Sequence, residues 1–264
     1  MEHCNLPTGV LLAALSLFII FNILRGRRGV QLFIRRLPGV AHIEEAVGRA
    51  TEMGRPVLFS SGLGVVDITT LQALAVLGHV VRIAARLRNR VIVPVYGADP
   101  ALFPVTQQVV REAYASADRP DLYNEGDIRF LSDQQFAYAA SVVGIMHREK
   151  VATNFLFGQF YAESLLLAET GQHVGAVQIA GTPATDQIPF FLATCDYTII
   201  GEEFYATSAY ITREPVHLGS LIGQDWGKML FAALVVVGLV WATIHGVPNW
   251  FSNLWSPYLT GGGP

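Results

Sequence analysis

The sequence is poor in charge, in cysteine and in lysine. Asp, Glu, Lys and Arg make up only 15% of its 264 residues, where about 25% is usual in soluble proteins. Apolar residues reach 52%, and the formal net charge is -3. This composition excludes a disordered chain, which needs low hydrophobicity and high charge. It also argues against binding to nucleic acid, because proteins that follow a phosphate backbone carry a basic excess.

Several signatures of catalysis are missing as well. The chain has only two lysines, Lys150 and Lys228, and neither stands in a phosphate-binding G-x-x-x-x-G-K-[ST] loop. Gly62 and Gly64 lack the third glycine of the dinucleotide fingerprint, because Asp67 takes its place. The H-E-x-x-H and G-x-S-x-G patterns are absent too. These absences exclude a P-loop NTPase and leave a zinc hydrolase and a nucleophile elbow unsupported.

Two long apolar runs lie near the ends of the chain. Residues 6–24 contain no charge, and residues 229–247 contain only His245 as a titratable group. Each run has the length that a helix needs to cross a bilayer. The basic residues follow the first run and precede the second, at Arg25, Arg27, Arg28, Arg35, Arg36 and Lys228. Because cytoplasmic flanks carry the Lys and Arg excess, we predict an inner-membrane protein with both termini outside and the central part cytoplasmic.

This topology divides the chain into three predicted parts. Residues 1–28 form an N-terminal transmembrane helix, 29–227 a cytoplasmic domain, and 228–264 a second transmembrane helix with an outer tail. Cys4 would lie outside and Cys195 inside, so the two cannot form a disulfide. The tail is rich in aromatic side chains that would rest at the headgroups or pack on a partner subunit: Trp241, Trp250, Phe251, Trp255 and Tyr258.

Between the spans, short apolar runs alternate with longer helical patterns. The runs at 56–61, 90–97, 127–132, 152–158, 176–181 and 197–201 read as strands, and helices are expected at 43–53, 67–88, 101–116, 133–149, 160–173, 185–195 and 203–212. Strands that are apolar throughout suit a parallel sheet covered on both faces. The alternation therefore predicts an α/β fold, a Rossmann-like doubly wound and mainly parallel sheet of about six strands.

A ligand of such a sheet would bind at the carboxyl ends of its strands. After the first strand, Ser60, Ser61, Gly62 and Gly64 offer hydroxyls and a free backbone before a helix begins, which favours a small anion. Asp67 is read either as a ligand contact or as the cap of that helix. After the fifth strand, Thr182 and Thr185 complete the predicted cofactor-binding set, while Asp186 and both threonines are equally typical of a helix cap.

Several other polar residues could have either a structural role or a chemical one. Glu202 and Glu203 could approach a metal together with Asp196, or they could stabilise a helix start through its dipole. Glu163 could be a ligand contact, or it could stabilise the first turn of a helix through the helix dipole. Cys195 lies at an apolar helix end, where a buried inert thiol is typical. We assign no catalytic residue, no metal ligand and no cofactor.

The apolar helices point to self-association. The helix at 67–88 has little polar surface, so it lies either at the centre of the domain or under another subunit. The Ala-rich helix at 133–149 poses the same choice. Small residues in the spans would permit helix contacts in the membrane: Ala13, Ala14, Ala232, Ala233 and Gly238. The connector at 216–228 is read as an amphipathic surface segment or as a linker helix packed on the domain.

Two stretches carry a resemblance. FGQFYAESLLLAETG (157–171) and PFFLATCDYTIIGEEFYATSAY (189–210) resemble uncharacterised prokaryotic two-span membrane proteins that have a cytoplasmic α/β domain of unknown function. The resemblance covers most of the central part and implies no activity and no functional residue.

Three functions remain open at this point. The first is a non-enzymatic scaffold subunit of a homo-oligomeric or multi-protein membrane assembly, which explains the low charge and the missing motifs together. The second is a membrane-tethered sensor domain for a nucleotide or small anion. The third is a hydrolase or transferase, for which no nucleophile, base and orienting group can be named together.

Overall fold

The structure, a computed structural model, describes residues 6–27, 38–212 and 215–245. The chain divides into two compact units, one of Ile34–Arg213 and one of Met1–Phe33 with Glu214–Pro264. Several residues used in the sequence analysis lie outside the described ranges: Cys4, Arg28, Arg35, Arg36, Trp250, Phe251, Trp255 and Tyr258.

The unit Ile34–Arg213 is built on a six-stranded sheet, as predicted. The strands are β1 (Val57–Gly62), β2 (Val91–Val95), β3 (Ile128–Phe130), β4 (Thr153–Gln159), β5 (Val177–Thr182) and β6 (Tyr197–Ile200). All neighbours pair in parallel, in the order β3-β2-β1-β4-β5-β6. This order is the one of the doubly wound dinucleotide-binding sheet. The α/β class and the parallel pairing are therefore confirmed.

The central strands are buried on both faces. Every residue of β1 and β2 is buried, and so are all residues of β4 except Gln159. Alternate residues face two separate apolar clusters: Phe59 and Phe155 belong to the larger one, and Leu58 and Leu156 belong to the smaller one. Neither face of these strands contacts solvent, so they need no polar side chains and appear in the sequence as continuous apolar runs.

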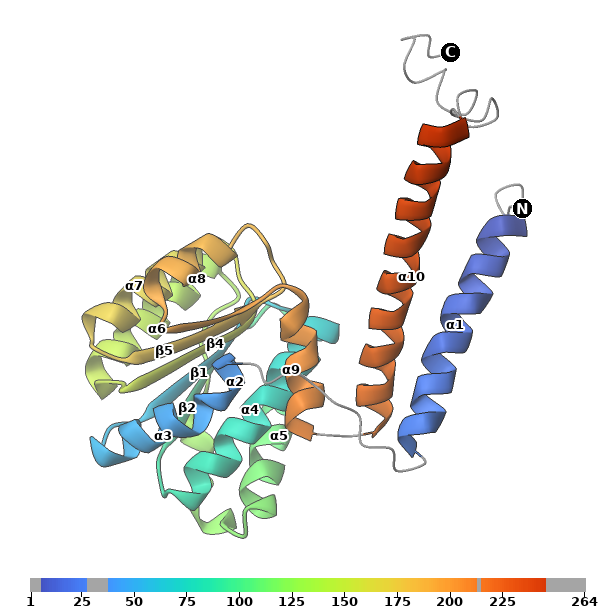
Figure 1. Cartoon of the computed structure of the whole chain (residues 1–264). Coiled ribbons are helices and arrows are strands. Elements are labelled where there is room, and N and C mark those ends of the chain that lie inside the picture. The colour runs from blue at the N-terminus through green and yellow to red at the C-terminus, as the bar shows by residue number, and fades with distance from the viewer. Residues whose placement is uncertain (1–5, 28–37, 213–214, 246–264) are drawn as a thin grey trace. The chain divides into compact units, whose positions relative to one another are not determined.

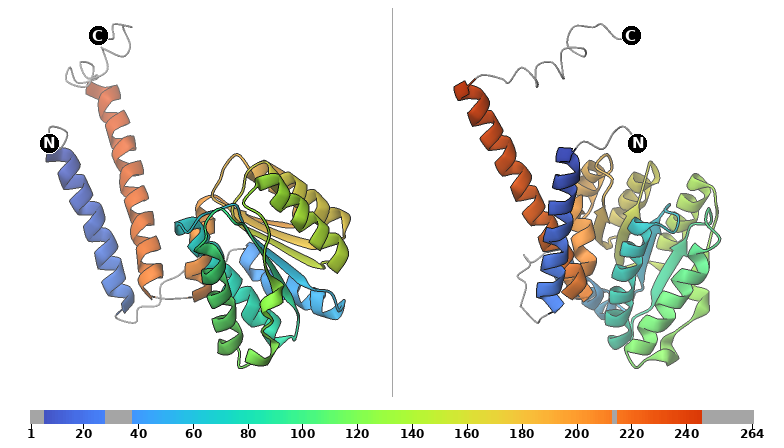
Figure 2. Two further views of the ribbon diagram at one scale, coloured as in Figure 1. Left: turned by 180° about the vertical axis from the view of Figure 1, so that it is seen from behind. Right: turned by 90° about the vertical axis from the view of Figure 1, so that its right-hand side faces the viewer.

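Helices cover both faces of the sheet (Figures 1 and 2). The larger cluster lies under α2 (Pro38–Ala41), α3 (Ile43–Glu52), α4 (Ile68–Arg86), α5 (Leu102–Ser116) and α9 (Glu202–Thr212). The smaller cluster lies under α6 (Gln135–Glu149), α7 (Glu163–His173) and α8 (Ile188–Thr194). Two short 3₁₀ turns, Pro120–Leu122 and Glu125–Asp127, precede β3. Seven of these helices were predicted, and the short α2 was not.

Helix α4 is the central helix of the domain, which decides between the two readings of its apolar surface. Twelve of its 19 residues are buried, in contact with α3, α5, α9 and the strands β1 and β4. The helix begins with Asp67, whose side chain accepts a hydrogen bond of 2.8 Å from the backbone N–H of Thr70. Asp67 is thus a helix cap, one of the two roles expected for it.

The other unit contains two helices that pack on each other. α1 (Leu6–Arg27) covers the first predicted span, and α10 (Pro215–His245) contains most of the second. Between residues 218 and 244 of α10, three glycines at a spacing of four are buried, namely Gly219, Gly223 and Gly227. A Cβ at Gly219 would meet the carbonyl oxygen of Asn22 at 2.7 Å, and a Cβ at Gly223 would meet the Cα of Ile19 at 2.7 Å. The absence of side chains at these positions lets the two backbones approach each other.

This packing changes two expectations from the sequence. The segment 216–228 continues into α10 as one helix instead of forming a separate linker, because its glycines face α1. The compact α/β unit accordingly ends at Arg213, before the expected boundary at 227. The small residues singled out in the spans play a lesser part: Ala13, Ala232 and Ala233 are exposed, and Gly238 has no neighbour within 4 Å of a Cβ position.

Candidate functional site

The strand order places a topological switch point between β1 and β4. The connection after β1 leads through α4 on one face, and the connection after β4 leads through α7 on the other face. In doubly wound sheets a ligand binds in the crevice outside the carboxyl ends of these two strands. The predicted residues Ser60, Ser61 and Gly62 end β1 at this point, and Gly64 follows them.

The backbones of β1 and β4 close on each other at the switch point. Gly62 has φ +73°, and a Cβ there would lie 2.0 Å from the carbonyl oxygen of Gln159. Gly158 has φ +138°, and its Cβ would lie 2.2 Å from the carbonyl oxygen of Ser61. The N–H of Leu63 donates to Gln159 O at 2.8 Å. Both glycines therefore serve a close contact between two strands, where a side chain has no room.

The predicted hydroxyls at this point are buried and bonded within the domain. Ser60 Oγ lies 2.8 Å from the hydroxyl of Tyr138 on α6 and accepts a bond of 3.2 Å from the N–H of Gly62. Tyr138 is fully buried, which raises the pKa of its hydroxyl. Ser61 is buried as well. The sequence pointed to Ser60 but not to Tyr138, the one phenol inside an Ala-rich helix.

The two threonines of the predicted set belong to another connection. Thr182 ends β5, is fully buried, and accepts a bond of 3.2 Å from the N–H of Ala184. Thr185 is exposed. Neither caps α8, which begins at Ile188 after Gln187. Since β4 lies between β1 and β5, the structure gathers Ser60, Ser61, Gly62 and Gly64 at one strand pair and leaves the threonines at the next.

One hydroxyl near the switch point has no partner among the described residues. Thr70 Oγ1, in the first turn of α4, is buried and makes no hydrogen bond. It lies against Gly64, where a Cβ would approach it to 2.3 Å. Two carboxylates stand beside this turn: Asp67 caps α4, and Asp99 accepts a bond of 2.9 Å from the N–H of Val66. The negative charges beside Thr70 disfavour a phosphate.

A buried carboxylate follows β4. Glu163, the first residue of α7, is fully buried. Its Oε2 accepts a bond of 2.6 Å from the amide of Gln135, and its Oε1 accepts one of 3.0 Å from the N–H of Tyr161. The carboxylate thus ties the start of α6 to the start of α7. Gln135 was missed in the sequence, where a single glutamine at a helix start carries no signal.

The described residues also lack the groups that metal or thiol chemistry needs. Within 6–27, 38–212 and 215–245, no cluster of three His, Cys, Asp or Glu side chains could hold a metal ion. Burial raises the pKa of the Cys195 thiol to about 12. A thiol of this kind stays protonated at neutral pH and is a poor nucleophile, in line with the inert role expected for it.

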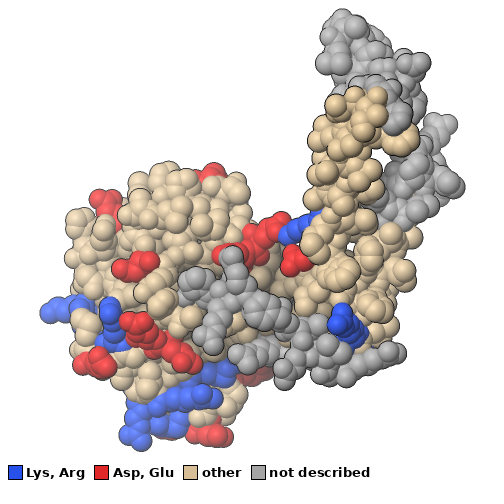
Figure 3. All heavy atoms as spheres, in the orientation of Figure 1, with Lys and Arg blue, Asp and Glu red and all other residues tan. Residues whose placement is uncertain are grey.

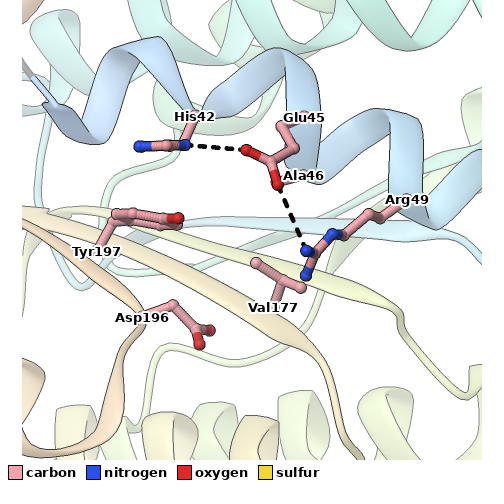
Figure 4. Close-up of a pocket in the computed structure, with 7 residues that line it drawn as sticks. All are labelled: His42, Glu45, Ala46, Arg49, Val177, Asp196 and Tyr197. Atoms are coloured by element: carbon pink, nitrogen blue, oxygen red, sulfur yellow. Dashed lines mark hydrogen bonds and ion pairs between the residues drawn. The ribbon is translucent and has the colours of Figure 1, made fainter.

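A small cavity lies where β5 and β6 begin, beside α3 (Figure 4). The ring of His42 stacks on Tyr197 with 4.0 Å between centroids, and His42 Nδ1 lies 3.0 Å from Glu45 Oε2. That hydrogen bond lowers the pKa of Glu45. The cavity measures about 60 Å³, the space of about two water molecules. Glu45 in its lining pairs with both His42 and Arg49. The cavity is too small for a substrate. It is lined by His42, Glu45, Ala46, Arg49, Val177, Asp196 and Tyr197.

We call the carboxyl edge the strand ends and the turns that follow them: residues 62–71, 95–102, 130–138, 159–166, 182–190 and 200–203. These segments contain no Lys, Arg or His. They expose large apolar side chains between exposed or half-exposed aspartates, which are Asp67, Asp99, Asp133 and Asp186. The apolar side chains are Val65, Val66, Ile68, Leu71, Phe130, Phe136, Tyr161, Leu165, Leu166, Phe190 and Ile200. The surface is therefore apolar and acidic at once.

The model of a family described as a domain of unknown function, DUF6754, matches residues 2–253. The chain belongs to the DUF6754 family. Comparisons with curated proteins and with solved structures find no match. The DUF6754 match runs through α1, the α/β unit and α10 together. The description of the DUF6754 family contributes no activity and no residue role.

Proposed function

We propose that the protein is a membrane-anchored scaffold: a non-enzymatic subunit of a homo-oligomeric or multi-protein assembly, with its α/β domain in the cytoplasm. The observation that carries the proposal is the exposure of α10. From Met229 to Ile244 no side chain is buried, and nearly all of them are apolar. An apolar cylinder of this kind is covered by lipid or by other protein helices.

The length of α10 supports the same proposal. Two described helices are long and apolar enough to cross a membrane, Ile68–Arg86 and Leu218–Ile244. The first is the buried core helix α4. The second is 27 residues long, or about 40 Å, which exceeds the hydrocarbon core of about 30 Å. Asp225 and Lys228 are exposed near its start, so the charge-free part above them is the segment that fits the bilayer.

The scaffold role, as opposed to a ligand-binding or catalytic one, is supported by the switch point. The place where this fold holds a nucleotide is filled by the contact of β1 with β4. The hydroxyl of Ser60 is hydrogen-bonded to that of Tyr138, and the carboxylate of Glu163 accepts a hydrogen bond from Gln135. No basic residue stands along the carboxyl edge to receive a phosphate. A nucleotide would have to displace all of these contacts.

Membrane extraction tests the anchor. In a carbonate wash of membranes at high pH, the full chain should stay in the pellet. A matched variant with Val236→Glu and Leu239→Glu places two charges on the exposed apolar stretch and should move a substantial part of the chain to the supernatant. Release of the unaltered chain would overturn the anchor. An exterior protease that cuts the α/β domain in intact cells would contradict its cytoplasmic location.

Thermal shift separates the scaffold from a nucleotide or anion sensor. The detergent-solubilised chain is heated with ATP, NAD or inorganic phosphate, and we expect no change in its melting temperature. A ligand present at about 100 times its Kd would stabilise the protein by about 2.7 kcal/mol. Thr70→Val is the informative variant, because the hydroxyl has no partner to lose. Stabilisation that disappears in Thr70→Val would favour the sensor over the scaffold.

A further inference from the structure

We propose that the carboxyl edge docks a basic, amphipathic helical segment of a partner protein. The proposal rests on the scaffold function and names the surface and the chemistry that carry it. It starts from two properties that occur together at this edge, large exposed apolar side chains and carboxylates without a basic residue among them.

The edge is one continuous surface, because hydrogen bonds join the neighbouring turns. The N–H of Val66 donates to Asp99 at 2.9 Å, which links the turns after β1 and β2. The hydroxyl of Tyr96 donates to the carbonyl of Asp133 at 2.6 Å, which links those after β2 and β3. The amide of Gln135 reaches Glu163, and the hydroxyl of Ser164 donates to Gln187 at 2.7 Å. Five of the six turns are thereby tied together.

The apolar side chains on this surface are too exposed to serve the core. Phe136 is 69% exposed, Ile68 66% and Tyr161 50%. These residues stand in first turns of helices or in the turns before them, where a polar residue would satisfy the fold equally well. Large apolar side chains that are exposed together on one surface mark an interaction site. The apolar face of an amphipathic helix is the usual occupant of a shallow apolar surface.

The carboxylates of the edge favour a partner of positive charge. Hydrogen bonds from the N–H groups of Val66 and Ala101 lower the pKa of Asp99 and keep it ionised. Asp67, Asp133 and Asp186 are exposed in other turns of the same edge. A membrane surface is a poor occupant, because the anionic cytoplasmic leaflet repels carboxylates and attracts Lys and Arg. A segment with Lys and Arg beside its apolar face satisfies both properties of the edge.

A second copy of the chain offers a weaker match. The opposite edge of the sheet contains most of the domain's arginines, but several are already paired with carboxylates of their own domain: Arg90 with Asp127 and Glu149, Arg119 with Asp121, and Arg129 with Glu149. Among the described residues, the exposed large apolar side chains beside these arginines include Met53 and Leu87. Such a surface cannot cover the apolar side chains of the carboxyl edge.

The test uses the full chain in nanodiscs of phosphatidylcholine and a fluorescent 18-residue helical peptide with Leu on one face and Lys on the other. We expect the peptide to bind chain-loaded discs more tightly than empty discs. A peptide with Glu in place of Lys should show no such difference. The double variant Asp133→Lys with Asp186→Lys should weaken binding by about tenfold or more, since it reverses two charges on the surface.

A matched variant locates the effect. Glu112→Lys with Glu169→Lys reverses two exposed carboxylates on α5 and α7 away from the carboxyl edge, and it should leave binding within about twofold of the unaltered chain. Asp133→Lys with Asp186→Lys should keep the melting temperature of the original, because neither side chain is buried. Equal loss in both variants, or no binding above empty discs, would overturn the proposal.

Two further outcomes distinguish this inference from the proposed function. Suppose that the chain resists carbonate extraction and that nucleotides do not change its melting temperature, but that the peptide does not bind. The scaffold function is then supported, and the proposed docking surface is wrong. If the peptide-free chain forms oligomers that dissociate in Asp133→Lys with Asp186→Lys, the edge binds a second copy instead, and the proposed partner is wrong. Native mass spectrometry of the chain in detergent measures its oligomeric state and so detects this outcome.

Discussion

The two edges of the sheet are held together in different ways. At the amino edge, where strands begin, charged side chains join the elements. Arg55 donates from its guanidinium to the carbonyls of Lys150, Val151 and Val174, and Arg90 bridges Asp127 and Glu149. At the carboxyl edge, the join is a backbone contact made through Gly62 and Gly158. On the face drawn in Figure 3, the Lys and Arg of the domain gather toward its lower left.

The difference shows which surface the fold needs for itself. The amino edge uses several of its charges to satisfy backbone carbonyls and carboxylates of its own domain. The carboxyl edge is closed by glycine contacts below the surface, and its exposed apolar side chains add little to the core. A surface that the fold does not need is the one that function can use.

The largest effect is expected from a side chain at the glycine contact. Gly62→Ala places a Cβ 2.0 Å from a carbonyl oxygen at a positive φ. Strain and overpacking together should lower the free energy of unfolding by about 4 kcal/mol. Gly54→Ala is the control, since Gly54 also has a positive φ of +62° but no atom within 4 Å. Urea denaturation of both variants measures the difference, and equal losses would show that the contact is not close.

A smaller loss is expected from the amino edge. Arg90→Met removes the guanidinium that lies 2.8 Å from Asp127, a carboxylate that is only 7% exposed. The unpaired carboxylate should cost about 2 kcal/mol, less than a fully buried pair because Arg90 is partly solvated. Arg119→Met, which removes an exposed pair with Asp121, should change the free energy of unfolding much less than Arg90→Met does, because exposed ion pairs are screened by solvent. A reversed order would contradict the role given to Arg90.

The smallest of the three effects depends on pH and comes from α4, between the edges. Burial, followed by the charges of Arg82 and Arg86, lowers the pKa of His79 to about 4, from about 6.5 in an unfolded chain. The unfolded state therefore binds more protons between these values, and stability falls as the pH drops from 6.5 toward 4. After allowance for partial exposure we expect a loss of about 1 to 2 kcal/mol.

The variant His79→Gln isolates this contribution. Its unfolding free energy should vary less between pH 7 and pH 4.5 than that of the original chain, because the side chain no longer takes up a proton. Denaturation curves at the two pH values measure the change. An identical pH dependence in both proteins would assign the acid sensitivity to other groups.

The sequence was sufficient for the elements of the fold because burial leaves a local signal. All six strands were located within about two residues, since a strand covered on both faces must be apolar throughout. The order of the strands in the sheet could not be predicted from the sequence, because it depends on the face of the sheet over which each connecting helix crosses. The short α2 was missed for a similar reason: PGVA carries no period, and it packs at Gly39 against Ile199 far along the chain.

The candidate site was predictable only in part. The sequence singled out Gly62 for the approach of its backbone to an anion, whereas in the structure its backbone approaches Gln159, a residue almost a hundred positions away that no local pattern connects to it. The hydrogen bond of Ser60 to Tyr138 has the same character. The glycines of α10 were overlooked because G-x-x-x-G next to charged residues resembles a linker, whereas in the structure it is the face toward α1.

Helix α4 has a consequence for the synthesis of the protein. Its segment Ile68–Arg86 is as apolar as a membrane span, yet it is covered in part by β4 and α9, which the ribosome makes later. At roughly 5 to 20 residues per second, about 6 to 25 seconds pass between the end of α4 and the end of α9. If α10 anchors the chain in a membrane as proposed, this apolar segment has to stay out of the bilayer until β4 and α9 cover it. Of the strands that α4 packs on, β1 is the only one made before it, so docking on β1 is the earliest protection available to the helix.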